Sequence, residues 1–335
     1  MTDNVNTTDR LFQLIESLSS VDAVSGDEGR FRSLLVERLS GLVDSVEEDP
    51  LGNLIAVRRT SGGGAARLLF ACTDEPGLVV THVDASGSLR VAPVGDLPAE
   101  LALGAGVRFP GEVRGVIAGS REQGGSLDFA SLRVDVGASN KEEAERLAPV
   151  GTRAAYDVPL ARQGDSVLGK ALDSKLGCAV LLEVLRRSKA EGICALFAAQ
   201  ERLGGRGLAA FASGGRGVAE AVGVSLADAS PGSTSSTAIS IGRGPALVVQ
   251  DGSHVADPGL ISRLEGAAGG AGIAVQRYVS KDGLKGPGHL QRAPGGISLA
   301  VLGIPARNVA GISQVARLAD VAAAAELLVR WADGA

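Results

Sequence analysis

Short, continuous apolar runs alternate along the chain with longer segments whose apolar residues recur at helical spacing. The run Cys194–Ala199 predicts a fully buried strand, because it is brief and is followed at once by polar residues and glycines. Similar runs predict strands at 54–57, 67–71, 221–226, 245–249 and 297–304. Ser25 to Glu28 has the form of a capping box before an amphipathic helix. This alternation is typical of an α/β fold.

The pattern changes between residue 78 and about residue 162, where short alternating segments are separated by turns rich in Gly, Pro and Asp. Regularly spaced short strands indicate a small β-barrel or sandwich. The α/β pattern resumes at Leu168, so we expect residues 78–163 to be inserted into one discontinuous α/β domain formed by residues 1–77 and 164–335. A glycine-rich hairpin is expected at 61–65.

Charged residues occupy the ends of the predicted strands. Glu201 and Arg202 follow the buried strand at 194–199, and Asp74 follows the strand at 67–71. Asp173 begins the long helix between them, where it is equally consistent with a simple N-cap. The carboxyl edge of a parallel sheet is the usual place for a site in an open α/β fold, so these residues define a candidate site. An adjacent Glu–Arg pair is, however, more often a surface feature.

Composition limits the class of protein. The 335 residues are 45% apolar, with a mean hydropathy of +0.18, which is ample for a large core. The net charge of −5 and the lack of a basic run argue against nucleic-acid binding. No apolar run approaches 18 residues, so we expect neither a signal peptide nor a membrane span. The three cysteines lack metal-type spacing and are consistent with the cytoplasm.

Several short motifs occur in a characteristic order. They include Asp-Pro-Leu-Gly-Asn-Leu-Ile-Ala at 49–56, Thr-Asp-Glu-Pro-Gly at 73–77, Val-Gly-Ala-Ser-Asn-Lys-Glu-Glu-Ala at 136–144, Gly-Lys-Ala-Leu-Asp at 169–173 and Gly-Arg-Gly-Pro-Ala at 242–246. From the first helix to the last, the chain resembles the TET-type dinuclear-zinc aminopeptidases, a family also named glutamyl aminopeptidase or cellulase M.

The resemblance implies a three-layer α/β/α domain of the phosphorylase/hydrolase type with an inserted, β-rich dimerisation domain. Dimers in this family often assemble into tetrahedral shells. The family holds two divalent metals with two histidines, a bridging aspartate, a glutamate and a second aspartate, and another glutamate acts as general base. Two such cations clamp the attacking water and the scissile carbonyl.

Most of these ligands are replaced when the family pattern is carried over. The first histidine corresponds to Cys72, although Asp74, the acid that would orient it, remains. The bridging aspartate is present as Asp173 and the general base as Glu201. The neighbouring glutamate ligand is replaced by Arg202.

The last two ligands are also missing. The second aspartate falls between Gly223 and Ser225, with Asp228 as the nearest acid, and the final histidine falls at Ala310. A guanidinium stays protonated and would occupy the space of a metal's charge. We therefore expect no metal and no cofactor, and we expect Arg202 to pair with Asp173, Glu201 or Asp74.

Three further residues are weaker candidates. Cys72 is a possible nucleophile if Arg202 or Lys175 lowers its pKa, although no histidine falls in a motif that would place it nearby. The family usually has arginine at the position of Lys175, whose simplest interpretation is a surface charge at a helix start. His289 follows a glycine-rich loop that resembles a substrate-side loop, but a surface histidine is the simpler interpretation.

The sequence thus favours an aminopeptidase-like pseudo-peptidase that binds a peptide, an amino-acid-like ligand or a partner protein. One alternative is a metal-independent enzyme that acts on an amino-acid or peptide derivative through Glu201, Asp173 and Cys72. Another is a divergent metallo-aminopeptidase. We expect a cytoplasmic homodimer or larger homo-oligomer, alone or mixed with an active paralogue.

Overall fold

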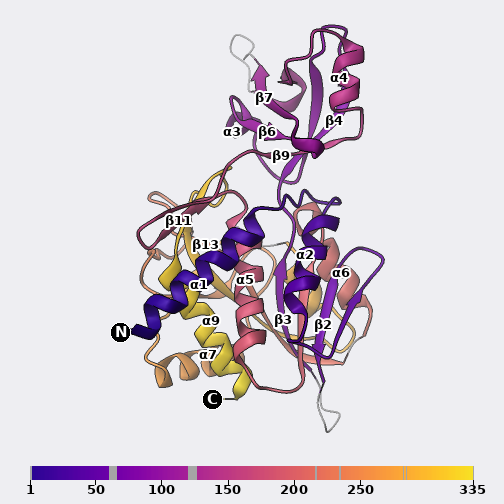
Figure 1. Ribbon diagram of the computed structural model, residues 1–335. Coiled ribbons are helices and arrows are strands. Elements are labelled where there is room, and N and C mark those ends of the chain that lie inside the picture. Colours follow the sequence, from indigo (N-terminus) through magenta and orange to yellow (C-terminus); the bar gives the residue numbers. More distant parts are fainter. Residues whose placement is uncertain are drawn as a thin grey trace.

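The computed structural model describes residues 2–59, 66–119, 127–215, 217–233, 235–281, 283 and 285–334. An α/β body contains both termini, and a smaller β-rich body projects from one end of it (Figure 1). The expected hairpin at 61–65 lies outside the described residues.

The α/β body is built on one large mixed sheet. Its main path runs β1 (Ser45–Glu48), β2 (Leu54–Arg58), β12 (Ile193–Ala198), β3 (Ala66–Cys72), β13 (Val218–Asp228), β16 (Ser298–Arg307), β17 (Gln314–Arg317), β11 (Ser166–Gly169) and β10 (Ala161–Gln163). Off this path, β14 (Ala246–Gln250) pairs with β16 and with β15 (Gln276–Val279). The central strands β12, β3, β13 and β16 are parallel, as expected, whereas the flanking pairs β2–β12, β14–β16 and β16–β17 are antiparallel.

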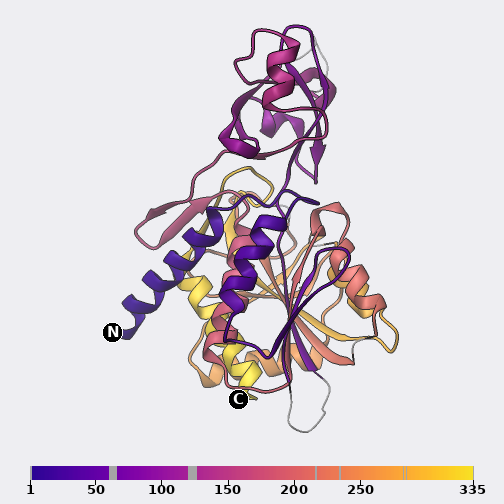
Figure 2. The ribbon, with the colours of Figure 1, turned by 45° about the vertical axis from the view of Figure 1, so that its right-hand side comes forward.

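Helices cover both faces of this sheet (Figure 2). One face carries α1 (Thr2–Ser19), α2 (Gly29–Leu39), α5 (Leu172–Arg187), α7 (Pro258–Gly270) and α9 (Leu318–Asp333). The other carries α6 (Arg206–Ser213) and α8 (Pro287–Gln291). Successive side chains of a strand point to opposite faces, so Leu69 and Ala71 of β3 join the first core while Leu68 and Phe70 join the second. The three-layer α/β/α architecture is confirmed.

Helix α5 lies directly against the centre of the sheet because Gly177 has no side chain. A Cβ there would lie 2.9 Å from the Cβ of Ala71 and 3.3 Å from the carbonyl oxygen of Val224. The close approach buries the helix almost completely and places its first turn beside the carboxyl ends of β3 and β13.

The start of α5 differs from the N-cap interpretation. Asp173 lies within the first turn, the N-cap is Ala171, and the amide of Leu172 donates to Gln314 Oε1 at 2.7 Å. Since Gln314 satisfies this amide from a distant strand, the carboxylate of Asp173 remains available for another partner.

The insertion forms a closed barrel. Its strands, in barrel order, are β4 (Gly77–Val83), β5 (Leu89–Val94), β8 (Leu132–Asp135), β7 (Arg114–Gly119), β6 (Gly106–Arg108) and β9 (Arg153–Tyr156). Short helices accompany them: α3 (Ala99–Ala102), η1 (Pro110–Glu112), η2 (Phe129–Ser131) and α4 (Lys141–Leu147). Strand β10, within the range expected for the insertion, lies in the large sheet instead.

Asp22 links the two bodies electrostatically. Its carboxylate accepts hydrogen bonds from Arg108 Nε and Nη2 of the barrel, both at 2.9 Å, and from Lys170 Nζ of the α/β body at 2.6 Å. Burial alone would raise the pKa of Asp22, but the hydrogen bonds and charges of Arg108 and Lys170 outweigh it and lower the pKa.

We predict that Asp22→Asn destabilises the protein by about 1–3 kcal/mol at pH 7, the range for a hydrogen bond to a charged group. A carboxyl whose folded pKa is lowered contributes stability above its unfolded pKa, and this is lost as the pH falls through the folded value. Urea unfolding from pH 7 toward pH 2 should therefore show the difference from wild type shrinking. The exposed Asp27→Asn serves as control, and a difference independent of pH would contradict the prediction.

Candidate functional site

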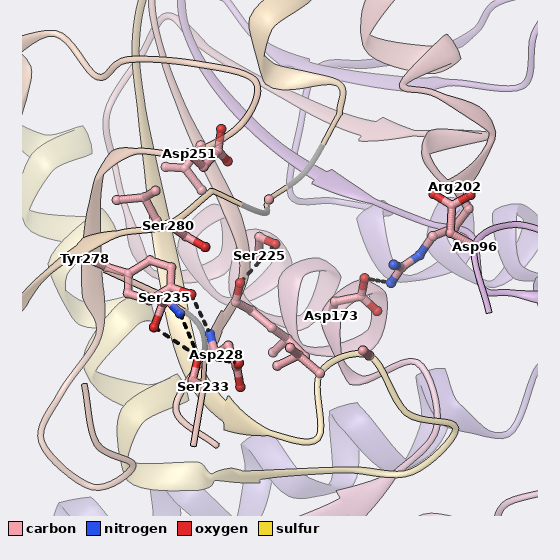
Figure 3. A pocket seen from close by; sticks show the side chains of 16 residues that line it. Asp96, Asp173, Arg202, Ser225, Asp228, Ser233, Ser235, Asp251, Tyr278 and Ser280 are labelled. Carbon is pink, nitrogen blue, oxygen red and sulfur yellow. Dashed lines mark hydrogen bonds and ion pairs between the residues drawn. The ribbon is translucent and has the colours of Figure 1, made fainter. Parts of the chain in front are cut away.

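A cavity of about 450 Å³ opens at the carboxyl edge of the sheet (Figure 3). The ends of β13, β14 and β15, the start of α5 and the segment after β16 form its walls, and Asp96 of the barrel also lines it. Asp173, Arg202 and Asp228 line this cavity, together with Ser225 and Ala310. The last two lie in the segments where the resemblance implies the second aspartate and the final histidine. The structure thus gathers much of the predicted pocket in one place.

Arg202 forms an ion pair with Asp173 at the wall of the cavity. It lies in the short helix η3 (Glu201–Leu203), and its Nη2 forms an ion pair with Asp173 Oδ2 (Figure 3). The side chain of Asp173 is only 5% exposed. The expected pairing of Arg202 is therefore confirmed, with Asp173 as its side-chain partner.

The carboxylate of Asp74 holds the backbone of the same arginine in place. Its Oδ2 accepts from the amide of Arg202 at 2.9 Å and from Ser25 Oγ at 2.5 Å. Burial raises the pKa of Asp74, although these donors and the guanidinium oppose the shift. The capping-box prediction is wrong: α2 begins at Gly29 without a side-chain cap, and Ser25 orders Asp74 instead.

Cys72 ends β3 next to this ion pair. Its thiol donates to Asp173 Oδ2 at 3.8 Å and it is 3% exposed. Burial raises the pKa of the Cys72 thiol, and the attraction of Arg202 does not compensate. The surroundings therefore hold the thiol protonated, the opposite of the lowered pKa expected for a nucleophile.

Glu201 is turned toward α6 and α8 and does not line the cavity. Its Oε1 accepts from the amide of Leu208 at 2.8 Å. Its Oε2 has no partner among the described residues, and a Cβ on Gly286 would lie 1.9 Å from it. Burial raises the pKa of Glu201 to about 8. Its pKa would suit a general base near neutral pH, but its position keeps it from the cavity.

Lys175 and His289 lie outside the cavity. Lys175 is fully buried, and its Nζ donates to the carbonyl of Val21 at 3.1 Å and lies 3.7 Å from the centre of the Phe31 ring. It is thus not the surface charge that a helix start suggested, because α5 is enclosed on all sides; burial lowers its pKa. His289 lies in α8, and its Nδ1 is 3.2 Å from Nη2 of Arg292, the residue that follows this helix.

Several cavity residues were not among the residues predicted from the sequence. Asp251 directly follows β14, which runs antiparallel to β16. The rule that found Asp74 and Glu201 applies to the ends of parallel strands and therefore does not lead to Asp251. Tyr278 lies inside a strand, and Ser233 and Ser235 lie in a loop, where no periodic pattern marks them.

The donors around Asp173 do not fit a pair of divalent metals. By the family resemblance, the guanidinium of Arg202 takes the place of a carboxylate ligand and cannot coordinate a metal. The Cys72 thiol takes the place of an imidazole, and its raised pKa opposes the loss of the proton that metal binding requires. In the ranges that the structure describes, no group of three or more His, Cys, Asp and Glu residues is arranged to hold a metal ion.

The family model for M42 glutamyl aminopeptidases matches residues 52–327. The chain belongs to this family.

Individual M42 relatives agree over nearly the whole chain. A protein of Acetivibrio thermocellus, provisionally assigned as an aminopeptidase, is 33% identical over 95% of this chain and 97% of its own. The structure of aminopeptidase APDkam598 from Desulfurococcus kamchatkensis is 28% identical, with a TM-score of 0.92 over 98% of this chain and 96% of that one. The TET1 peptidase of Pyrococcus horikoshii, which can assemble into a tetrahedron or a large octahedral shell, shares the fold at 22% identity, with a TM-score of 0.87 and coverage of 96% and 99%.

Within the described part of the chain, no helix has both the length and the apolar character needed to cross a membrane.

We predict that Glu201→Gln stabilises the protein increasingly as the pH rises. A carboxyl with a raised folded pKa has its full stability below the unfolded pKa near 4.5 and loses it as the pH rises through about 8. The gain over wild type should be small at pH 5 and about 2–4 kcal/mol at pH 9. Chemical denaturation at both pH values measures it, with the exposed Glu100→Gln as control; an equal effect at both would contradict the buried carboxyl.

Proposed function

We propose that this M42 homologue has exchanged the dinuclear metal site for an internal ion pair and binds a peptide or amino-acid-like ligand in the cavity. The observation that carries the proposal is the guanidinium of Arg202 on Asp173, the residue that resembles the family's bridging ligand. A second cation at the same carboxylate would meet the repulsion of a fixed positive charge.

The cavity supports the binding part of this proposal. It has the volume of a small-molecule site, and it combines aliphatic walls with hydroxyl and carboxylate groups. Aliphatic side chains such as Val248 and Val301 can cover the apolar part of a ligand, while Ser225 and Asp228 can orient its polar groups.

A metal-independent enzyme has weaker support. It requires Cys72 or Glu201 to reach a substrate, but the thiol has a raised pKa and the carboxyl is covered by Gly286. Both observations favour a binding protein over the catalytic alternative.

We also propose a homo-oligomer assembled through the barrel. TET1 of Pyrococcus horikoshii forms closed shells. The barrel of this chain exposes apolar side chains that a partner copy would cover, among them Leu101, Val116 and Val150 at 44%, 54% and 60% exposure. Light scattering of the purified protein should give the mass of at least a dimer, whereas a monomer at micromolar concentration would contradict this part. Co-expression with a tagged active M42 paralogue would test mixed assembly.

Metal analysis combined with peptidase assays tests the main proposal. Protein purified without chelator should contain well under one zinc or cobalt per chain, and added metal should not produce release of amino-terminal residues from chromogenic aminoacyl substrates. Two metals per chain together with such release would establish a working metallo-aminopeptidase and overturn the proposal. Metal-free turnover abolished by Cys72→Ser would instead establish the alternative enzyme.

We predict that Arg202→Met destabilises the protein by about 3 kcal/mol, because it leaves Asp173 buried without its partner. The double variant Arg202→Met/Asp173→Asn should recover most of this loss, since the buried charge is removed as well. Thermal and urea unfolding measure both. Arg206→Met, a nearby exposed arginine, is the matched control; equal losses in the single and double variants would contradict the ion-pair account.

A further inference from the structure

A second cavity, of about 270 Å³, lies between the barrel and the α/β body. The segment before α2 and the first turn of this helix form one wall, with Asp22, Val24, Asp27 and Arg30. The barrel forms the other wall with the segment from Arg108 to Glu112 and with Arg153 and Ala155 of β9. This cavity shares no lining residue with the cavity at the edge of the sheet. A ligand held here would contact both bodies.

Arg153 reaches this cavity without a counter-charge. Its Nε is buried and has no hydrogen-bond acceptor among the described residues, and its guanidinium forms no ion pair with any of them. A buried donor without an acceptor is costly and rare in native proteins. An acceptor oxygen of a bound molecule would remove this cost.

Close packing on Gly26 holds the guanidinium of Arg153 against the α/β body. A Cβ on Gly26 would lie 3.2 Å from Nη2 and 3.7 Å from Cζ of Arg153. Gly26 has a φ of +78°, in the left-handed region that glycine adopts readily. The arginine of the barrel is therefore positioned at the other body before any ligand binds, which reduces the entropy lost on binding.

Arg30 adds a second positive charge from the α/β body. It is exposed and forms no ion pair within the described part of the chain. It lies in the first turn of α2, which begins without a side-chain cap, so the positive end of the helix dipole adds to its charge. Two guanidinium groups without counter-charges thus line one cavity from two bodies.

The acids of this cavity leave both arginines available. Asp22 is already held by Arg108 and by a lysine of the α/β body. Asp27 and Glu112 are exposed, so solvent and salt screen their charges. A guanidinium offers a planar set of donors that matches the oxygens of a carboxylate or phosphate group.

We propose that this cavity binds a small oxyanion, the phosphate or carboxylate group of a ligand, between Arg153 of the barrel and Arg30 of the α/β body. The bound group accepts hydrogen bonds from Arg153, including one from its buried Nε, and the charge of Arg30 attracts it. Because its walls belong to both bodies, the occupied cavity joins the barrel to the α/β body. This site is independent of any ligand in the cavity at the edge of the sheet.

Inorganic phosphate, acetate and chloride test the site at equal ionic strength and pH 7.5. Calorimetry with the full chain should give a Kd of about 1 mM or lower for at least one oxyanion and no measurable binding of chloride. At about 20 mM this oxyanion should raise the midpoint of thermal unfolding by at least about 2 °C over chloride. Tighter binding of phosphate indicates a phosphorylated ligand, and tighter binding of acetate indicates a carboxylate.

Three variants locate the binding, since phosphate also stabilises folded proteins without occupying a site. Arg153→Met keeps the apolar stem of the side chain but removes its donors, and it should weaken oxyanion binding at least about tenfold. Arg30→Met should weaken it about three- to tenfold. Arg133→Met removes an exposed arginine of β8 outside the cavity and should bind the oxyanion as the wild type does.

Two results would overturn the proposal. One is a wild-type protein that binds neither oxyanion at about 20 mM or shows the same response to chloride. The other is oxyanion binding that survives in both Arg153→Met and Arg30→Met, because the anion then lies elsewhere. Should Arg153→Met fail to fold, the comparison of Arg30→Met with Arg133→Met decides, since both of these residues are exposed.

Discussion

The constraint on which the carboxyl edge of the sheet depends is the neutralisation of its buried acids. Asp74, Glu75, Asp173 and Glu201 are each less than a tenth exposed. Burying an ionised carboxylate costs several kcal/mol unless a counter-charge, donors or a proton compensates. Arg202 supplies the counter-charge for Asp173. Backbone and side-chain donors serve Asp74 and Glu75, and Lys170 reaches Glu75 at 3.1 Å. The raised pKa of Glu201 indicates that this carboxyl is neutralised by a proton over much of the neutral pH range.

The same compensation connects the site to the rest of the architecture. Lys170 contacts Glu75 beneath the site and Asp22 at the base of the barrel, so one cation belongs both to the edge of the sheet and to the junction between the two bodies. Gly95 of the barrel packs against the site, since a Cβ there would lie 3.2 Å from the Cβ of Arg202. Asp96 then completes the rim of the cavity. The barrel therefore shapes the pocket as well as offering an apolar surface.

Hydrophobic periodicity predicted the elements well because it reflects burial, and the ordered motifs implied the three-layer architecture through the family resemblance. Fully apolar runs gave the central strands, and the change to short strands gave the barrel. The pairing of Arg202 was expected because a fixed positive charge stands where the resemblance implies a metal ligand. The directions of the side chains could not be predicted from the sequence. Glu201 accepts from an amide at the start of α6, Ser25 donates to Asp74, and Gln314 accepts from the first amide of α5. Such contacts join residues far apart in the chain and depend on packing of whole elements, which a local pattern does not contain. Lys175 is an example of this limit of sequence-based prediction. Its position at the start of a helix predicts exposure, but the elements packed around α5 bury it completely.

The residues at the positions of the implied ligands are consistent with one another, because an arginine supplies the positive charge that metal ions would otherwise supply. Once a guanidinium occupies the carboxylate of Asp173, a neighbouring imidazole would either stay neutral or add a second positive charge, whereas the protonated thiol of Cys72 adds none. A general base is useful only where a water molecule can be activated, and the packing of Gly286 on Glu201 closes the space such a molecule would need. Elsewhere in the cavity, Asp228 is held by the amide of Ser230 and the hydroxyl of Ser233, and Asp251 lies 2.8 Å from His254 Nδ1. On the proposed account, the protein itself therefore supplies the positive charge beside Asp173.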